Sequence, residues 1–85
     1  MWFFYVVRCS DNSLYAGITT NIKRRVHEHN NTKRGAKYTR SRRPVHLVAH
    51  ERFHSKQEAM LNENAFKKKS KKEKEEYCRD YEKYR

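Results

Sequence analysis

The sequence places polar side chains at positions where the elements of a small domain need apolar ones. Two are tyrosines on neighbouring predicted strands, two lie one helical turn apart, and the last is a carboxylate in an apolar helix stripe: Tyr5, Tyr15, Arg25, His29 and Glu63. An unpaired polar group costs about 1–3 kcal/mol when it is buried, and an ionised group costs more. A small domain that keeps such a set together indicates a site retained for chemistry.

The residue types suit phosphate binding and proton transfer. The Arg25 guanidinium offers a fork of donors to phosphate oxygens, and the His29 imidazole can pass a proton near neutral pH. A tyrosine activated by a neighbouring histidine or by metal-bound water can act as a general base. The Glu63 carboxylate must be neutralised, paired with a cation or bound to a metal ion.

Each of these residues also has a purely structural explanation. Glu63 can pair with Arg25, or its helix can be rotated so that Leu61 and Ala65 are buried instead. Arg25 can lie along the sheet with its head in water, and His29 can cap the C-terminus of its helix. The two tyrosines can be packing residues with their hydroxyls at the edge of water.

A hairpin is predicted at the N-terminus. Residues 2–7 are aromatic and β-branched, residues 10–13 supply turn chemistry, and residues 14–18 form the returning strand. If the loop holds an odd number of residues, such as 10–12, Tyr5 and Tyr15 share a face of the sheet.

The remaining elements follow from periodicity and capping residues. They are a helix over about 22–30 capped by Thr20 or Asn21, a loop over 31–44, a strand over 45–53, a helix over about 55–69 opened by a Ser55–Glu58 capping box, and a last helix over about 70–84. The helix over 22–30 turns Arg25 and His29 towards the sheet.

Two apolar patterns complete this prediction. Alternation along the strand over 45–53 gives it one apolar face, made of Val45, Leu47, Ala49 and Phe53. In the helix that follows, Glu63 falls within about 60° of three apolar residues, Ala59, Met60 and Phe66.

Composition limits the class of protein. Eighty-five residues make one domain, with 21 Lys and Arg against 10 Asp and Glu, a formal charge of +11. This excess points to a polyanionic partner, most simply nucleic acid, with an anionic membrane surface as the competing explanation. No apolar run approaches the roughly 20 residues of a spanning helix. Cys9 and Cys78 belong to no CxxC pair and the chain begins without signal-peptide features, so we expect a reduced, cytoplasmic protein, although a bridge between the two cysteines stays open.

The predicted loop carries much of this charge. We expect it to clamp a nucleic-acid backbone through Lys33, Arg34, Lys37, Tyr38, Arg40, Arg42 and Arg43. Tyr38 can stack on a base or pack under the loop, and the alternative for the whole segment is a merely solvated basic loop. Because no helix presents an evident set of base-reading side chains, weak sequence specificity is expected.

Two further patterns are structural. His46, His50 and His54 share a strand face, but a spacing of four residues separates neighbours by about 13 Å, too far for one zinc ion. Tyr77, Tyr81 and Tyr84 form a helical stripe that is expected to dock on the domain rather than to bind a partner.

The joint spacing of these motifs resembles the GIY-YIG nuclease family, specifically its small single-domain bacterial members. Residues 3–5 stand at the GIY segment with both leading positions replaced by Phe, and residues 15–17 stand at the YIG segment as Tyr-Ala-Gly. Arg25, His29 and Glu63 match the arginine, the His or Tyr position and the metal-binding glutamate of the family. The resemblance covers about residues 2–70, without a match to the asparagine that follows the glutamate in several members.

The resemblance implies a fold. We expect an α+β, GIY-YIG-type ββαβα domain, with a three-stranded antiparallel sheet flanked by helices and followed by a C-terminal helix. It forms a single domain over 1–85, with a core over about 1–69 and a helical extension over about 70–85.

The resemblance also implies a one-metal phosphodiester hydrolase. Glu63 holds one Mg²⁺ or Mn²⁺, Tyr5 takes the proton of the attacking water with help from Tyr15 or His29, and Arg25 stabilises charge on the scissile phosphate. Either tyrosine can be the base, and Gly17 has a structural role that allows close approach.

The expected function is a DNA endonuclease, structure-selective or weakly sequence-specific, in repair or recombination. RNA as a substrate and a protein partner that supplies specificity both stay open, and no membrane partner is expected. The alternative is a non-catalytic nucleic-acid-binding module on the same scaffold.

Overall fold

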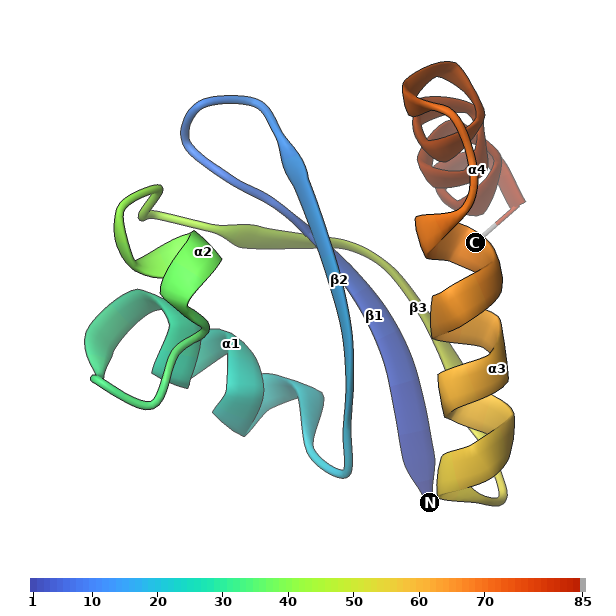
Figure 1. Ribbon diagram of the computed structural model, residues 1–85, viewed down its shortest axis with the longest axis horizontal. Coiled ribbons are helices and arrows are strands. Elements are labelled where there is room, and N and C mark those ends of the chain that lie inside the picture. The colour runs from blue at the N-terminus through green and yellow to red at the C-terminus, as the bar shows by residue number, and fades with distance from the viewer. Residues whose placement is uncertain (85) are drawn as a thin grey trace.

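The computed structural model describes residues 1–84 and shows an α+β fold, as predicted. A three-stranded antiparallel sheet with the order β2-β1-β3 is combined with four helices (Figure 1). Along the chain the elements are β1 (Trp2–Arg8), β2 (Leu14–Thr19), α1 (Ile22–Asn31), α2 (Lys37–Arg40), β3 (His46–Phe53), α3 (Lys56–Lys67) and α4 (Lys71–Tyr84).

The β1–β2 hairpin has the predicted register. Cys9 and Ser13 close a three-residue loop through the Cys9 amide, which donates to the Ser13 carbonyl at 2.8 Å. Asn12 at the end of this loop has a φ of 71°, a left-handed conformation that asparagine tolerates better than most residues. Tyr5 therefore pairs with Gly17 and Tyr15 with Val7, which puts both tyrosines on one face.

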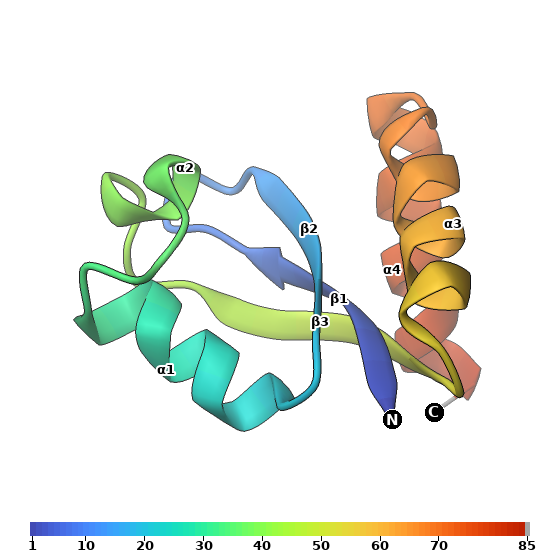
Figure 2. The ribbon, with the colours of Figure 1, turned by 60° about the horizontal axis from the view of Figure 1, so that its bottom comes forward.

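The sheet is covered on both faces (Figure 2). Phe4 and Val6 of the central strand pack towards α3 and α4, in a cluster with Phe66 and Cys78. The alternate residues Tyr5 and Val7 of β1 face α1. They form a second cluster with Cys9 and Val45, and Val26 packs against it. The central strand is thus buried on both sides, which explains why residues 2–7 show no alternation of polar and apolar types.

A β-bulge changes the predicted face of β3. Val6 pairs with Ala49 but Val7 pairs with Leu47, so Val48 has no partner in the ladder. The prediction of one apolar face for this strand is therefore wrong. Val45 and Leu47 join the α1 side, whereas Ala49, Val48 and Phe53 join the side of α3 and α4.

The segment predicted as a loop contains the short helix α2. The amides of Thr39 and Arg40 both donate to the Ala36 carbonyl at 3.1 Å. Four residues are too few to show helical periodicity, and this turn is held by the buried Thr39 side chain rather than by a pattern in the sequence.

α3 packs through a narrower stripe than predicted. Ala59 and Phe66 are buried, but Met60 is exposed, so its place in the stripe is a wrong prediction. Leu61 is 70% exposed, and the helix is therefore not rotated to bury Leu61 and Ala65. The Phe66 ring lies 5.4 Å from that of Phe4, and the predicted capping box of Ser55 and Glu58 opens the helix.

α4 docks on the sheet, as its tyrosine stripe predicts. Tyr77 and Tyr81 pack against the Phe4 cluster, and the Tyr77 hydroxyl donates to the Glu51 carboxylate at 2.6 Å. The side chain of Tyr84 lies outside the described residues. Cys9 and Cys78 are buried and unbonded. Within residues 1–84, no helix combines the length and hydropathy needed to cross a membrane.

Phe66 is the residue that fixes α3 to the sheet. We expect Phe66→Ala to lower the free energy of unfolding by about 3–5 kcal/mol, because the cavity lies between α3 and the central strand. Urea denaturation measures the change. Leu61→Ala, an exposed change on the same helix, should stay within about 0.5 kcal/mol of wild type, and equal losses in the two variants would contradict this assignment.

Candidate active site

A chain of buried hydrogen bonds leads from the sheet to α2. The Tyr5 hydroxyl lies 2.7 Å from His29 Nε2, and His29 Nδ1 lies 2.8 Å from the Thr39 hydroxyl. Thr39 in turn donates to the Ala36 carbonyl at 3.0 Å. Tyr5, His29 and Thr39 are all almost completely buried, so their hydrogen bonds lie in a region of low dielectric constant, where they are stronger than in water.

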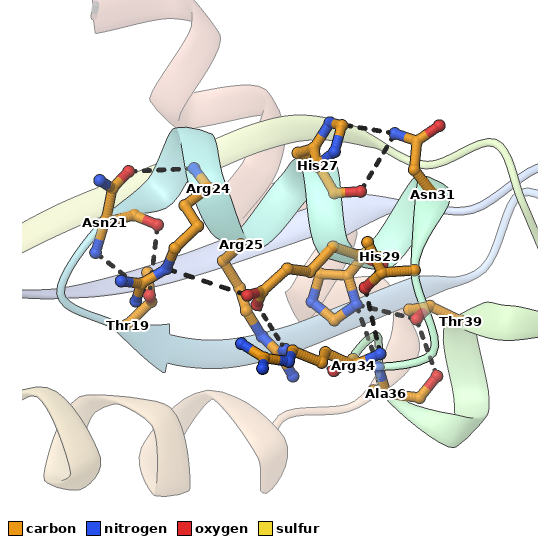
Figure 3. A network of polar contacts seen from close by, with 12 residues as sticks. Thr19, Asn21, Arg24, Arg25, His27, His29, Asn31, Arg34, Ala36 and Thr39 are labelled. Atoms are coloured by element: carbon orange, nitrogen blue, oxygen red, sulfur yellow. Dashed lines mark hydrogen bonds and ion pairs between the residues drawn. The ribbon is translucent and has the colours of Figure 1, made fainter.

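The direction of these hydrogen bonds can be assigned from the network. Thr39 has one hydroxyl proton, and the Ala36 carbonyl takes it. On this basis we assign the proton shared with Thr39 to His29 Nδ1, which leaves Nε2 as an acceptor for the Tyr5 hydroxyl. The Ala36 amide also donates towards Nδ1, at 3.4 Å, which favours the opposite tautomer, and the assignment follows the shorter contact with Thr39. Figure 3 shows His29 with Thr39 and Ala36, its partners at the α2 turn.

Burial keeps both groups neutral. Burial raises the pKa of Tyr5 to about 12. The nearby Arg25 guanidinium lowers this pKa, whereas Tyr15 and Glu63 raise it further. Burial, helped by the charge of Arg25, lowers the pKa of His29 to about 4. At neutral pH the site therefore holds a protonated tyrosine hydrogen-bonded to a neutral imidazole.

Gly17 leaves the space that the Tyr5 ring occupies. A Cβ at position 17 would lie 2.7 Å from the Tyr5 hydroxyl oxygen and 2.9 Å from the ring carbon that bears it. Both distances are shorter than side chains tolerate, and position 17 is opposite Tyr5 in the ladder. The glycine is required here by close approach, not by its backbone conformation.

Tyr15 connects the site to the basic loop. Its ring meets the His29 ring edge-on at 5.4 Å and stacks on the Tyr38 ring at 5.8 Å, with an angle of 20° between the planes. The Arg42 guanidinium lies 3.9 Å from the centre of the same Tyr38 ring. Arg42 also pairs with Asp11 of the hairpin loop at 3.0 Å. Tyr38 is therefore packed within the protein, although it is 38% exposed.

Arg25 lies at the mouth of the site. One of its guanidinium nitrogens donates to Glu28 at 3.0 Å and to the Arg34 carbonyl at 2.8 Å (Figure 3). These contacts hold the side chain over the sheet instead of extended into water, and they leave its other donors for a ligand. The carboxylate that it pairs with is Glu28 and not Glu63.

Glu63 approaches from α3, on the other side of β2 from α1 (Figure 1). Its side chain is only 16% exposed, and its carboxylate lies 3.3 Å from the Lys67 ammonium, one helical turn further on. Glu63 is close enough to Tyr5 to raise the pKa of that residue. The edge strand β2 thus stands between Arg25 on one face and Glu63 on the other.

This donor set fits a hard divalent cation better than zinc. Across residues 1–84, no three His, Cys, Asp or Glu side chains are placed to share a metal ion. Mg²⁺ commonly uses one or two carboxylates and takes its other ligands from water and substrate phosphate. The partly buried Glu63, which is paired with the Lys67 ammonium, can supply such a carboxylate ligand.

The basic residues of the predicted loop separate into two groups. Arg43 donates to the backbone carbonyls of Glu28, His29 and Thr32, so it caps the C-terminal end of α1. Arg42 is held by Tyr38 and Asp11, as described above. The other basic side chains of the set face solvent, and they are Lys33, Arg34, Lys37 and Arg40.

Thr39 is the part of the site that sequence reasoning did not identify. Thr39 lies between Tyr38 and Arg40, which are predicted to contact nucleic acid through an aromatic ring and a positive charge. A threonine in a basic loop shows no sequence pattern that predicts burial or a role in a site. Only its burial and its contact with His29 reveal it. Lys67 was likewise not assigned, although its position four residues after Glu63 on a helix places the two side chains together.

Comparisons with known proteins agree with this geometry. The family model described as the GIY-YIG catalytic domain matches residues 1–77. The UPF0213 protein of Desulfotalea psychrophila is 55% identical over 69 residues, which are 81% of this chain but only 63% of that protein, somewhat less than two thirds of its length. The UPF0213 protein YazA of Bacillus subtilis is 54% identical over 78 residues, 92% of this chain and 78% of its own. An E. faecalis protein solved by NMR superposes with a TM-score of 0.63 at 46% identity, covering 94% of this chain and 84% of that one.

The buried His29 makes stability depend on pH. In the unfolded chain the pKa of His29 is about 6.5, whereas in the folded protein His29 is not protonated until about pH 4. The contribution of the neutral His29 to the free energy of unfolding is therefore complete above pH 6.5 and is lost as the pH falls from 6.5 to 4. At about 1.4 kcal/mol per pKa unit, this loss is ~3 kcal/mol. Urea denaturation of wild type and His29→Gln should show the stability difference shrinking by that amount, whereas parallel pH profiles would contradict it.

Thr39 is expected to fix the tautomer of His29. Thr39→Val removes the hydroxyl that accepts from Nδ1 at nearly constant volume, so the Nε2–H form should gain population. Imidazole ¹⁵N chemical shifts measure the change directly. Thr39→Ser keeps the hydroxyl and should keep the wild-type spectrum. Identical imidazole spectra in wild type and a folded Thr39→Val variant would show that Thr39 does not set the tautomer.

Proposed function

Because this chain belongs to the GIY-YIG family, whose catalytic domain spans residues 1–77, we propose that it is a divalent-metal-dependent DNA endonuclease. The observation that carries the proposal is the buried hydrogen bond from Tyr5 to the neutral His29. Any buried tyrosine hydroxyl needs a hydrogen-bond partner, but the partner here is a titratable imidazole, which can take the hydroxyl proton when the tyrosine oxygen accepts one from water.

The proposed role of Tyr5 follows from that contact. As its oxygen takes a proton from the attacking water, its own proton passes to His29 Nε2. Burial and the charge of Arg25 disfavour the imidazolium, so His29 carries the proton only transiently, while the negatively charged phosphate is at the site and Nδ1 keeps its hydrogen bond to Thr39. The hydroxide attacks phosphorus, the bond to the 3′ oxygen breaks with its electron pair on that oxygen, and the 3′ oxygen is protonated by solvent, while His29 returns its proton to solvent through Tyr5. Tyr15, which meets His29 edge-on, positions the imidazole in this scheme.

Arg25 and Glu63 act on the phosphate from opposite sides of β2. The free donors of Arg25 bind the non-bridging oxygens and offset the charge that grows on them. Glu63 is the residue that would hold one Mg²⁺ or Mn²⁺. A bound ion supplies Lewis-acid stabilisation of the phosphate and of the leaving oxygen. In the free protein the Lys67 ammonium forms an ion pair with the Glu63 carboxylate. If a metal ion took its place beside Glu63, Lys67 would become available to a phosphate oxygen.

DNA is the proposed substrate because solvent-facing cations border the site. Lys33, Arg34, Lys37 and Arg40 are exposed, and backbone contacts of this kind position a nucleic acid without reading its sequence. Arg42, Arg43 and Tyr38 are proposed to hold the loop in shape. We therefore propose a structure-selective or weakly sequence-specific enzyme that works in repair or recombination in the cytoplasm.

The first test is cleavage of labelled duplex, flap, junction and single-stranded DNA with Mg²⁺ or Mn²⁺. Wild type should cut, and Glu63→Gln should lose activity by about 100-fold or more, since metal stabilisation is worth several kcal/mol. Glu76→Gln, a change on α4 with the same loss of charge and away from the site, should cut as wild type does.

Binding measured in EDTA separates the two functions that the scaffold allows. If the protein is an enzyme, Glu63→Gln should bind DNA at least as tightly as wild type while failing to cut it. Salt-dependent binding by all three proteins, with no cleavage of any substrate, would instead establish a non-catalytic nucleic-acid-binding module.

A further inference from the structure

A groove opens at the end of the molecule where the hairpin loop meets the start of α4. It has a volume of about 390 Å³ and is lined by Asp11, Asn12, Ser13, Leu14, Lys71, Lys74 and Glu75. Figure 1 shows the hairpin loop and the α3–α4 junction at the same end of the fold. None of these residues takes part in the candidate active site.

The two acidic and two basic residues of the lining balance formally, but both acidic residues are paired with arginines from outside the groove. Glu75 receives two hydrogen bonds from Arg8, at 2.8 and 2.9 Å, and Asp11 pairs with Arg42 at 3.0 Å. Neither Lys71 nor Lys74 has an ion-pair partner in the described part of the chain. Two ammonium groups are therefore available to an anion.

The walls of the groove are held in place before any ligand arrives. The Arg8–Glu75 pair joins the end of β1 to α4, and Lys74 lies over the Phe66 ring, 5.8 Å from its centre. Groups fixed in this way lose little conformational freedom on binding.

The groove is physically linked to both sides of the candidate active site. Asp11 contacts Arg42, which lies on the Tyr38 ring, and that ring stacks on Tyr15. On the other side, α4 follows α3 after three residues, and α3 carries Glu63 and Lys67. A strand that crosses the site between α1 and α3 can continue past Lys67 into the groove.

We propose that this groove is a second contact surface for the nucleic-acid backbone, with Lys71 and Lys74 each neutralising a phosphate. This proposal rests on the proposed function, because the ligand is the same polyanion that the site is proposed to cut. The exposed loop cations and the groove would then hold the substrate on both sides of Tyr5. An acidic protein is the competing ligand for the same charges.

Salt-dependent binding of labelled duplex and flap DNA, measured by fluorescence anisotropy in EDTA, tests the groove. Removing one phosphate-binding cation should reduce the steepness of log K against log salt by about 0.9. Lys71→Gln/Lys74→Gln should therefore reduce it by about 1.8. The matched control is Lys69→Gln/Lys72→Gln, which removes the same charge from neighbouring exposed positions outside the groove and should change the steepness much less.

The outcomes separate this proposal from the function on which it rests. If wild type binds and cuts DNA but the two double variants show equal reductions in steepness, or none, the groove is not a defined contact and the proposed function stands. If wild type binds no nucleic acid, both proposals fail, and an acidic protein becomes the ligand to test for the two groove lysines. Circular dichroism melting should confirm that both double variants are folded.

Discussion

The hydrogen bond between Tyr5 and His29 is the interaction on which the rest of the site depends. It joins the central strand to α1 in a buried environment, where an unpaired hydroxyl or imidazole would be costly. Its geometry requires Gly17 opposite Tyr5 and Thr39 behind His29. Burial keeps both groups neutral, and Nε2 is the ring nitrogen of His29 that faces the Tyr5 hydroxyl.

The thin sheet makes this arrangement compatible with stability. One face of the central strand supports the polar network, while the other carries Phe4 and Val6 against α3 and α4. The apolar packing on the second face offsets the cost of burying tyrosine and histidine on the first. The same packing presents Glu63, because Phe66 fixes the helix that carries it.

The large positive charge of the chain has two separate uses. Arg8, Arg42 and Arg43 form directed contacts with carboxylates, a ring and backbone carbonyls, for which the planar guanidinium is well suited. The lysines of the chain stay largely at the surface, where they are available to a polyanion. Counting basic residues therefore overestimates the number that can contact a nucleic acid.

The sequence by itself determined the three strands and the helices α1, α3 and α4, the hairpin register and the convergence of Tyr5, Tyr15 and His29. These depend on local periodicity, turn chemistry and a two-residue strand repeat. The sequence also placed Glu63 beside Ala59 and Phe66 on α3, where its side chain is only 16% exposed. Only the tertiary structure decided the bulge at Val48, the α2 turn and the buried Thr39. Those features arise from contacts between segments that are distant in the chain, to which no local pattern responds. For the same reason, only the folded protein could show which arginines are committed to structure and which cations remain free.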